Sequence, residues 1–250
     1  MKTLFISDLH LSPDQPELIR LATDFVAQQV NVDAFYILGD IFNTWLGDDL
    51  VPPEFDPFIQ ALQKLQQQGS KIYLMVGNRD FMLGKAFARR VGGTLLEDPV
   101  MIDVYGHKIL LMHGDSLCTD DVSYQRYRKV VRNRWLQKLF LAMPLTVRQG
   151  ISDKIKAKSK QQKQYKQAQI MDVNPAAVRQ VMQQYNARLL LHGHTHRPAI
   201  HTLQSSQNIA NYRIVLGDWQ PDASYIEITP EKIRLVDKRL PEGQAILSVN

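Results

Sequence analysis

Five short polar clusters, each placed directly after a run of strand-forming apolar residues, constrain the fold of this 250-residue chain more than any other feature. In chain order they are Asp-Leu-His at 8–10, Gly-Asp at 39–40, Gly-Asn-Arg-Asp at 77–80, His-Gly at 113–114 and Gly-His-Thr-His at 193–196. In open α/β sheets, sites form outside the carboxyl ends of the strands. The clusters are therefore expected to meet at one edge of the fold.

The periodicity of apolar residues predicts the elements around these clusters. Strands are expected at 2–7, 34–38, 71–76 and 189–191, with a hairpin at 100–104 and 108–112. Helices are expected at 16–29, 55–68 and 175–185. A closing antiparallel set is expected from 212–216, 224–229 and 232–236. Alternation of this kind is typical of α/β layers.

Composition excludes several classes of protein. Apolar residues make up 44% and charged residues 22% of the chain, which excludes a disordered protein. The single Cys118 excludes a disulfide framework and fits a reducing compartment. No apolar run approaches the roughly 18–20 residues of a membrane span, and Asp8 comes too early for a signal peptide. A soluble intracellular protein is expected.

The donor atoms of the five clusters are those of a metal centre. Carboxylate, amide and imidazole donors together suit Mn²⁺, Fe or Zn²⁺ better than Ca²⁺, and the size of the set requires two ions. A single histidine at a strand end more often caps or packs than ligates, but five such clusters in this order are improbable by chance. The candidate ligands are Asp8, His10, Asp40, Asn78, His113, His194 and His196.

The order of these clusters resembles the calcineurin-like metallophosphoesterase family, all of whose five signature motifs are matched. The resemblance implies a four-layer α/β fold, a β-sandwich flanked by helices, with a helical cap inserted. It also implies two metal ions bridged by Asp40. The first would be held by Asp8, His10, Asp40 and His196, and the second by Asp40, Asn78, His113 and His194. His192 has no counterpart among the family's ligands and is expected to be a strand residue.

Arg79 carries information about the leaving group. Relatives that cleave phosphomonoesters or phosphodiesters usually have histidine at this position, where it can protonate a departing alkoxide. Arginine cannot act as an acid, but it can hold a phosphate through two hydrogen bonds. A departing phosphate needs no general acid, so Arg79 favours cleavage of a phosphoanhydride. The alternative is an ordinary surface arginine in a loop.

The positive charge is concentrated in one segment. The chain as a whole carries 30 Lys and Arg against 25 Asp and Glu, for a net charge of +5. Residues 126–166 contain 13 of these cations and a single acid, Asp153, which gives +12 for the segment and −7 for the remainder. The segment also has an apolar stripe at helical spacing, formed by Leu136, Leu139, Phe140 and Met143, and Pro144 is expected to end or kink that helix.

Three interpretations of this stripe are open. A core-facing stripe with a solvated basic side is the commonest. A basic amphipathic helix that carries Trp, Phe and Leu is also typical of binding to an anionic membrane surface. Nucleic acid attracts the same charge, but the segment offers few aromatic side chains for base stacking. Lipid is therefore favoured over nucleic acid, and no nucleic-acid partner is expected.

Longer stretches narrow the resemblance to the pyrophosphohydrolases that act on UDP-2,3-diacylglucosamine in the lipid A pathway of Gram-negative bacteria. The stretches that carry it are 7–10, 36–40, 77–81, 113–115, 117–121, 170–174 and 192–198. The resemblance implies that the two ions are Mn²⁺ and that water attacks the α-phosphate, which releases UMP and 2,3-diacylglucosamine 1-phosphate. It further implies a peripheral enzyme on the cytoplasmic face of the inner membrane, and a monomer is expected.

The same resemblance implies the domain organisation and the substrate contacts. Residues 1–120 and 170–250 would form the catalytic core, and 121–169 an inserted basic cap. The substrate contacts would be Asn78, Arg79, Asp121, Ser159, Lys163, Lys166 and His194. Ser159, Lys163 and Lys166 share one helical face by their spacing. Position 163 departs from the family, which often has asparagine there.

Two other functions are compatible with the fold. A nuclease or cyclic-nucleotide phosphodiesterase of this fold is expected to have histidine at position 79 and to lack the apolar cap. A non-enzymatic interaction module, as in a retromer subunit of the same fold, is expected to have lost metal ligands. Fold alone does not separate these functions, so the choice depends on the site.

Overall fold

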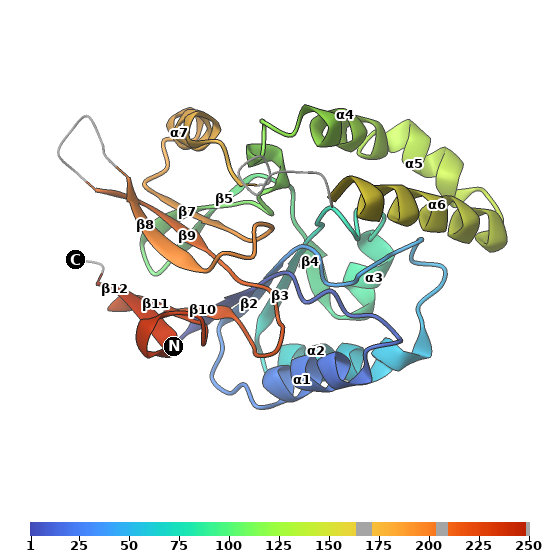
Figure 1. Cartoon of the computed structure of the whole chain (residues 1–250). Helices are drawn as coiled ribbons and strands as arrows, with labels where there is room; N and C mark the ends of the chain where they lie inside the picture. The colour runs from blue at the N-terminus through green and yellow to red at the C-terminus, as the bar shows by residue number, and fades with distance from the viewer. Residues whose placement is uncertain (164–171, 204–209, 249–250) are drawn as a thin grey trace.

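The structure, a computed structural model, describes residues 1–163, 172–203 and 210–248, apart from the side chains at 156 and 158–163. Two β-sheets lie face to face in the described chain (Figure 1). The first contains β1 (Thr3–Ile6), β2 (Ala34–Leu38), β3 (Lys71–Met75), β4 (Gly93–Leu95), β10 (Tyr225–Ile228), β11 (Lys232–Val236) and β12 (Gln244–Ser248). Its strand order is β12-β11-β10-β1-β2-β3-β4.

The second sheet contains β5 (Val100–Val104), β6 (His107–Leu111), β7 (Leu189–His192), β8 (Ala199–Leu203) and β9 (Asn211–Val215). Its strand order is β5-β6-β7-β9-β8. In each sheet the strands that precede the polar clusters are neighbours and run parallel: β1, β2 and β3 in the first sheet, and β6 and β7 in the second.

Helices cover the outer faces of both sheets. On the first sheet lie α1 (Pro16–Ala27), α2 (Asp56–Gln67) and α3 (Lys85–Arg90), and on the second lies α7 (Pro175–Gln184). Strand β2 shows how the sequence produces these layers, because all five of its side chains are buried and alternate between two cores. Phe35 and Ile37 pack toward the helices, whereas Ala34, Tyr36 and Leu38 pack between the sheets. The predicted four-layer α/β fold is confirmed.

Most predicted elements agree with the structure to within one or two residues. One prediction about pairing is wrong: 212–216 does not belong to the closing antiparallel set. Strand β9 joins the second sheet, parallel to β7 and antiparallel to β8, and the closing set is β10-β11-β12. An apolar alternation specifies a strand but not its partner, so the sequence pattern could not make this distinction. The short elements α3, β4, β8 and β12 were not predicted.

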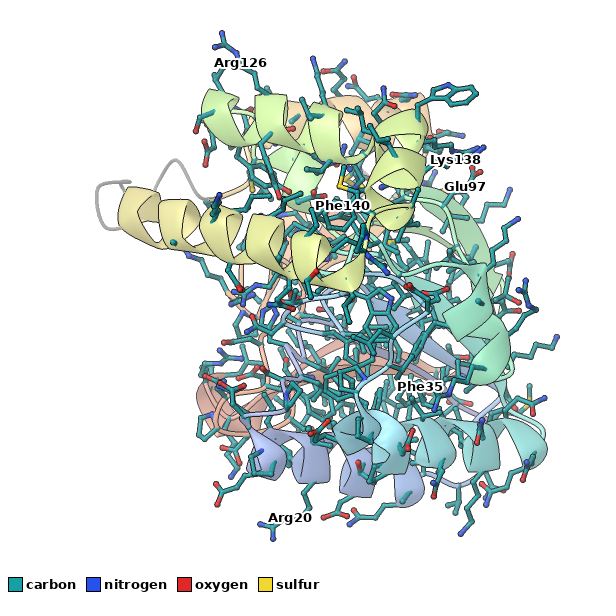
Figure 2. The ribbon with its side chains drawn as sticks, turned by 90° about the vertical axis from the view of Figure 1, so that its right-hand side faces the viewer. Arg20, Phe35, Glu97, Arg126, Lys138 and Phe140 are labelled. Carbon is teal, nitrogen blue, oxygen red and sulfur yellow. The ribbon has the colours of Figure 1, made fainter. Side chains whose placement is uncertain are left out.

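Three further helices follow one another beside the sheets: α4 (Val122–Val131), α5 (Arg134–Leu141) and α6 (Leu145–Lys163). Pro144 separates α5 from α6, as the sequence predicts. Phe140 and Met143 are half-buried, and Figure 2 shows Phe140 on the inner side of these helices, but Leu136 and Leu139 are exposed. The stripe is therefore only partly a packing face. No helix in the described part of the chain is long and apolar enough to cross a membrane.

Candidate metal centre

All five polar clusters meet at one end of the two sheets. Asp8 and Asp40 follow β1 and β2, Asn78 follows β3, and His113 and His194 follow β6 and β7. Five of the seven candidate ligands have a left-handed backbone, with φ between 51° and 67°: Asp8, His10, Asp40, His194 and His196. Non-glycine residues rarely adopt this conformation, and it concentrates at functional sites where the surrounding fold enforces it.

One group of donors surrounds Asp8. The Nε2 atom of His196 lies 3.3 Å from Asp8 Oδ1 and 3.1 Å from His10 Nε2. The Nδ1 atom of His10 lies 3.7 Å from Asp40 Oδ2 and has no hydrogen-bond partner among the described residues. A buried ring nitrogen without a partner, 3.7 Å from a carboxylate oxygen, fits a cation site.

A second group lies on the other side of Asp40. The Nε2 atom of His113 lies 3.8 Å from Asp40 Oδ1 and 3.0 Å from Asn78 Oδ1, and His194 Nδ1 lies 2.7 Å from the same Asn78 oxygen. His113 Nδ1 donates to the carbonyl oxygen of Leu38 at 2.9 Å, which fixes the ring with Nε2 toward the site. The two carboxylate oxygens of Asp40 therefore face the two groups.

Two glycines permit this crowding. A Cβ atom at Gly77 would lie 2.1 Å from Asp40 Oδ1, and a Cβ atom at Gly193 would lie 2.1 Å from Asp8 Oδ2. The close approach of the loops therefore requires glycine at both positions.

Burial and neighbouring charges determine the protonation of the metal-free donors. Burial raises the pKa of Asp40 to about 7, and burial lowers the pKa of His194 to about 4. Burial alone would lower the pKa of His113, but the carboxylates of Asp40 and Asp8 raise it to about 9. The buried acids thus stabilise a positive charge among them, as a bound cation would supply. The donor set fits divalent transition-metal ions.

Asp80 is a site residue to which the sequence pattern assigned no role. Its buried carboxylate accepts hydrogen bonds from the amides of Gly77 at 2.6 Å, Ile41 at 2.7 Å and Asp40 at 3.3 Å. These bonds join the loop after β2 to the loop after β3. The sequence signal for Asp80 was its position as the fourth residue of the Gly-Asn-Arg-Asp cluster.

Asp218 is another residue that the sequence reasoning missed. Its Oδ2 atom lies 3.5 Å from His196 Nδ1, on the side of the ring opposite the donor group, and Arg239 donates to its carbonyl oxygen at 2.9 Å. Such carboxylate–histidine pairs orient metal ligands. The signal was available, because Gly217-Asp218 is a further Gly-Asp pair that directly follows a strand.

The remaining predicted site residues fall into three groups. Arg79 lies at the site, with its amide donating to Asp40 Oδ1 at 2.8 Å and its Nε 3.7 Å from Asp40 Oδ2, and its guanidinium also donates to Asn43. Asp121 caps the amino end of α4 by accepting from the amide of Tyr124 at 3.0 Å. The predicted contacts outside the described side chains are Ser159, Lys163 and Lys166. His192 ends strand β7, as expected.

Comparison with known proteins adds three close relatives and one family. The Calcineurin-like phosphoesterase family matches residues 1–198. A UDP-2,3-diacylglucosamine hydrolase of Serratia proteamaculans (strain 568) is 48% identical over 237 residues, covering 94% of this chain and 98% of that protein. Proteins of the same name from Aeromonas hydrophila and Escherichia coli O7:K1 are 46% and 44% identical, again covering 94% of this chain and 98% of theirs.

Proposed function

The chain belongs to the calcineurin-like phosphoesterase family, and we infer that, in line with the function that its relatives' names state, it hydrolyses the pyrophosphate bond of UDP-2,3-diacylglucosamine in lipid A biosynthesis. The observation that carries this inference is the donor set itself, because all seven candidate ligands lie at one end of the sheets with Arg79 beside Asp40. A non-enzymatic module would have no need of a complete set. A phosphodiesterase that releases an alkoxide is expected to have an acid where this chain has Arg79.

We propose that two Mn²⁺ ions occupy the two donor groups. Asp8, His10 and His196 would hold one ion, Asn78, His113 and His194 the other, and Asp40 both. When bound, such a pair lowers the pKa of water to near neutrality and offsets charge on the phosphoryl oxygens. The protein's own contribution is then to orient the substrate, with Arg79 holding the departing sugar phosphate and neutralising its growing charge.

The position of bond cleavage tests this function. The purified protein is incubated with Mn²⁺ and UDP-2,3-diacylglucosamine in ¹⁸O-labelled water, and the products are separated by mass spectrometry. Attack on the α-phosphate places the label in UMP and leaves 2,3-diacylglucosamine 1-phosphate unlabelled. Label in the lipid phosphate would contradict the proposed reaction, as would brisk hydrolysis of a cyclic nucleotide without turnover of the lipid.

Residues 121–169 are proposed to form a cap that docks on the anionic cytoplasmic face of the inner membrane. Helices α4 and α5 contain no fully buried residue, and Trp135 and Leu139 expose 79% and 59% of their surface. Lys138 lies over the Trp135 ring at 5.1 Å, so cationic and apolar groups share this surface. Ser159, Lys163, Lys166 and Asp121 are proposed to contact the substrate beneath the cap, with Asn78, Arg79 and His194 at the metal centre.

Vesicle binding tests the membrane proposal. Leu139→Ser is expected to weaken binding to phosphatidylglycerol-containing vesicles by about 10- to 100-fold, because burial of a leucine side chain contributes about 1.5–3 kcal/mol. The control Val30→Ser changes an equally exposed side chain outside the cap and should leave binding unchanged. Binding that is insensitive to Leu139→Ser would contradict the proposal.

The protein is also proposed to be a monomer. Analytical ultracentrifugation tests this, because a monomer should sediment at the mass of one chain, 28.7 kDa.

A further inference from the structure

Helix α4 contacts all three of the loops that carry the second donor group. Arg132, which caps the carboxyl end of α4, donates to the carbonyl oxygens of Gly77 at 2.9 Å and Val76 at 3.3 Å, directly before Asn78. Arg128 reaches the loop of His113, and Tyr124 reaches both that loop and His194. These three side chains, Tyr124, Arg128 and Arg132, are called the α4 clamp.

On the loop of His113, the residue that contacts the α4 clamp is Asp115. Its buried carboxylate accepts from Tyr124 Oη at 2.6 Å and from Arg128 Nε at 2.8 Å, and Arg132 Nη2 lies 3.9 Å away. Asp98, a second buried acid, lies 3.7 Å from Arg128 Nη2. Removing one partner from a buried charge cluster is costly, because the remaining charge is left unpaired in a medium of low polarity.

Contact with the third loop is made by an aromatic ring. The Tyr124 ring stacks on the His194 imidazole with 6.1 Å between centroids and 29° between planes. The same tyrosine donates to Asp115, so a single side chain joins the loops after β6 and β7. A displacement of α4 would therefore disturb the placement of His113 and His194 together.

The clamp is selective for one half of the metal centre. In the described part of the chain, α4 and Arg132 make no hydrogen bond or ion pair with Asp8, His10 or His196. His196 has Asp218 beside its Nδ1 atom instead. No residue of α4 is fully buried, and the contacts of Arg128 and Arg132 with the loops are polar.

We propose that docking of α4 and binding of the second metal ion are linked, with the α4 clamp acting as a positioning device for Asn78, His113 and His194. The inference rests on the proposed metal centre. An ion in the second donor group would be held more tightly when α4 is docked, and by reciprocity the ion would stabilise α4 on the core. A cap that engages substrate would thereby also secure the metal centre.

Mn²⁺ titration of Arg132→Gln tests the linkage. Binding to the chelator-treated full-length protein is followed by calorimetry and by the electron paramagnetic resonance of free Mn²⁺. An Asn78→Ala variant identifies which of two binding steps belongs to the second donor group. Loss of an outer-sphere contact typically weakens metal binding 10–100-fold, so the dissociation constant of that step is expected to rise about tenfold, with the other step unchanged.

Arg126→Gln is the matched control. It removes the same charge from the same helix, but Arg126 is exposed and projects away from the core (Figure 2). Its two binding steps should equal those of the parent protein. Unchanged affinity in Arg132→Gln, or equal weakening of both steps, would contradict the role of α4. Failure of the parent protein to bind a second ion would contradict the metal centre and the linkage together.

Hydrogen exchange provides a second measurement that needs no variant. Saturation with Mn²⁺ should slow amide exchange in α4 by about the same factor as the linkage changes affinity, because the coupling is reciprocal. The amides of α1, on the far side of the first sheet, serve as an internal reference. Equal exchange in α4 with and without Mn²⁺ would overturn the proposal.

Discussion

Replacement of Asp40 by asparagine is expected to lower the rate of pyrophosphate hydrolysis by about 10³-fold or more. Its two carboxylate oxygens face the two donor groups, at 3.7 Å from His10 and 3.8 Å from His113, so it is proposed to be a ligand that both groups share. Loss of several kcal/mol of charge stabilisation corresponds to a rate effect of this size. Steady-state kinetics with UDP-2,3-diacylglucosamine at saturating Mn²⁺ measures the change.

The control for this variant is Asp24→Asn, which neutralises an exposed acid on α1 and should retain full activity. Chelation of the parent protein should abolish turnover, and added Mn²⁺ should restore it, whereas Asp40→Asn should remain inactive. Substantial turnover by Asp40→Asn at ordinary Mn²⁺ concentrations would contradict the bridging role of Asp40.

Asp40→Asn is not expected to unfold the protein. The pH dependence of the free energy of unfolding tests this expectation. Burial raises the pKa of Asp40 to about 7 in the metal-free fold, against about 3.9 in an unfolded chain. Between these values the folded state binds the extra proton, so this group's contribution to the free energy of unfolding falls as pH rises from about 4 to 7. Urea titrations in chelator should show a shallower decline over that range in the variant than in the parent.

Replacement of Arg79 by alanine is expected to reduce pyrophosphate cleavage by about 10²–10³-fold while leaving metal content intact. The size is that of losing one preorganised group that stabilises developing charge. Arg79 holds its side chain beside Asp40 and Asn43 but supplies no metal-ligating atom, so Mn²⁺ stoichiometry should not change. Kinetics and metal analysis of the same preparation separate the two effects.

Two comparisons sharpen this prediction. Arg89→Ala removes an exposed cation from α3 and should have no effect on the rate. Bis(4-nitrophenyl) phosphate has a leaving group without a phosphate, so the rate of its hydrolysis is expected to depend less on Arg79 than the rate for the lipid substrate does. An unchanged rate for the lipid substrate in Arg79→Ala would remove the argument for leaving-phosphate recognition.

Local patterns predicted the elements that position the candidate site. A buried strand is recognisable from its own five residues, as at Ala34–Leu38, and the polar residue that follows needs no distant information to be placed at the strand's carboxyl end. Parallel pairing of such strands then brings their ends together. This is why the fold class and the region of the site followed from the sequence.

The contacts that hold the loops of the site in place could not be predicted from the sequence. Asp80 meets Ile41 across 39 residues, and Arg132 meets Gly77 across 55. No sequence pattern marks a contact over either separation, and the sequence does not distinguish a buried aspartate from one in an exposed turn. Asp115 is an example. It directly follows the His-Gly cluster, but nothing in the sequence shows that its partners are Tyr124 and Arg128 on α4.

The sequence by itself determined the layers of this protein and the candidate donors, because both depend on residue type and short-range spacing. Only the tertiary structure decided that β9 joins the second sheet, that Asp218 stands behind His196, and that α4 is fastened to the loops of Asn78, His113 and His194. Partner choice of this kind depends on which strand edges and surfaces the rest of the fold leaves uncovered. That is a property of the whole chain rather than of any segment in it.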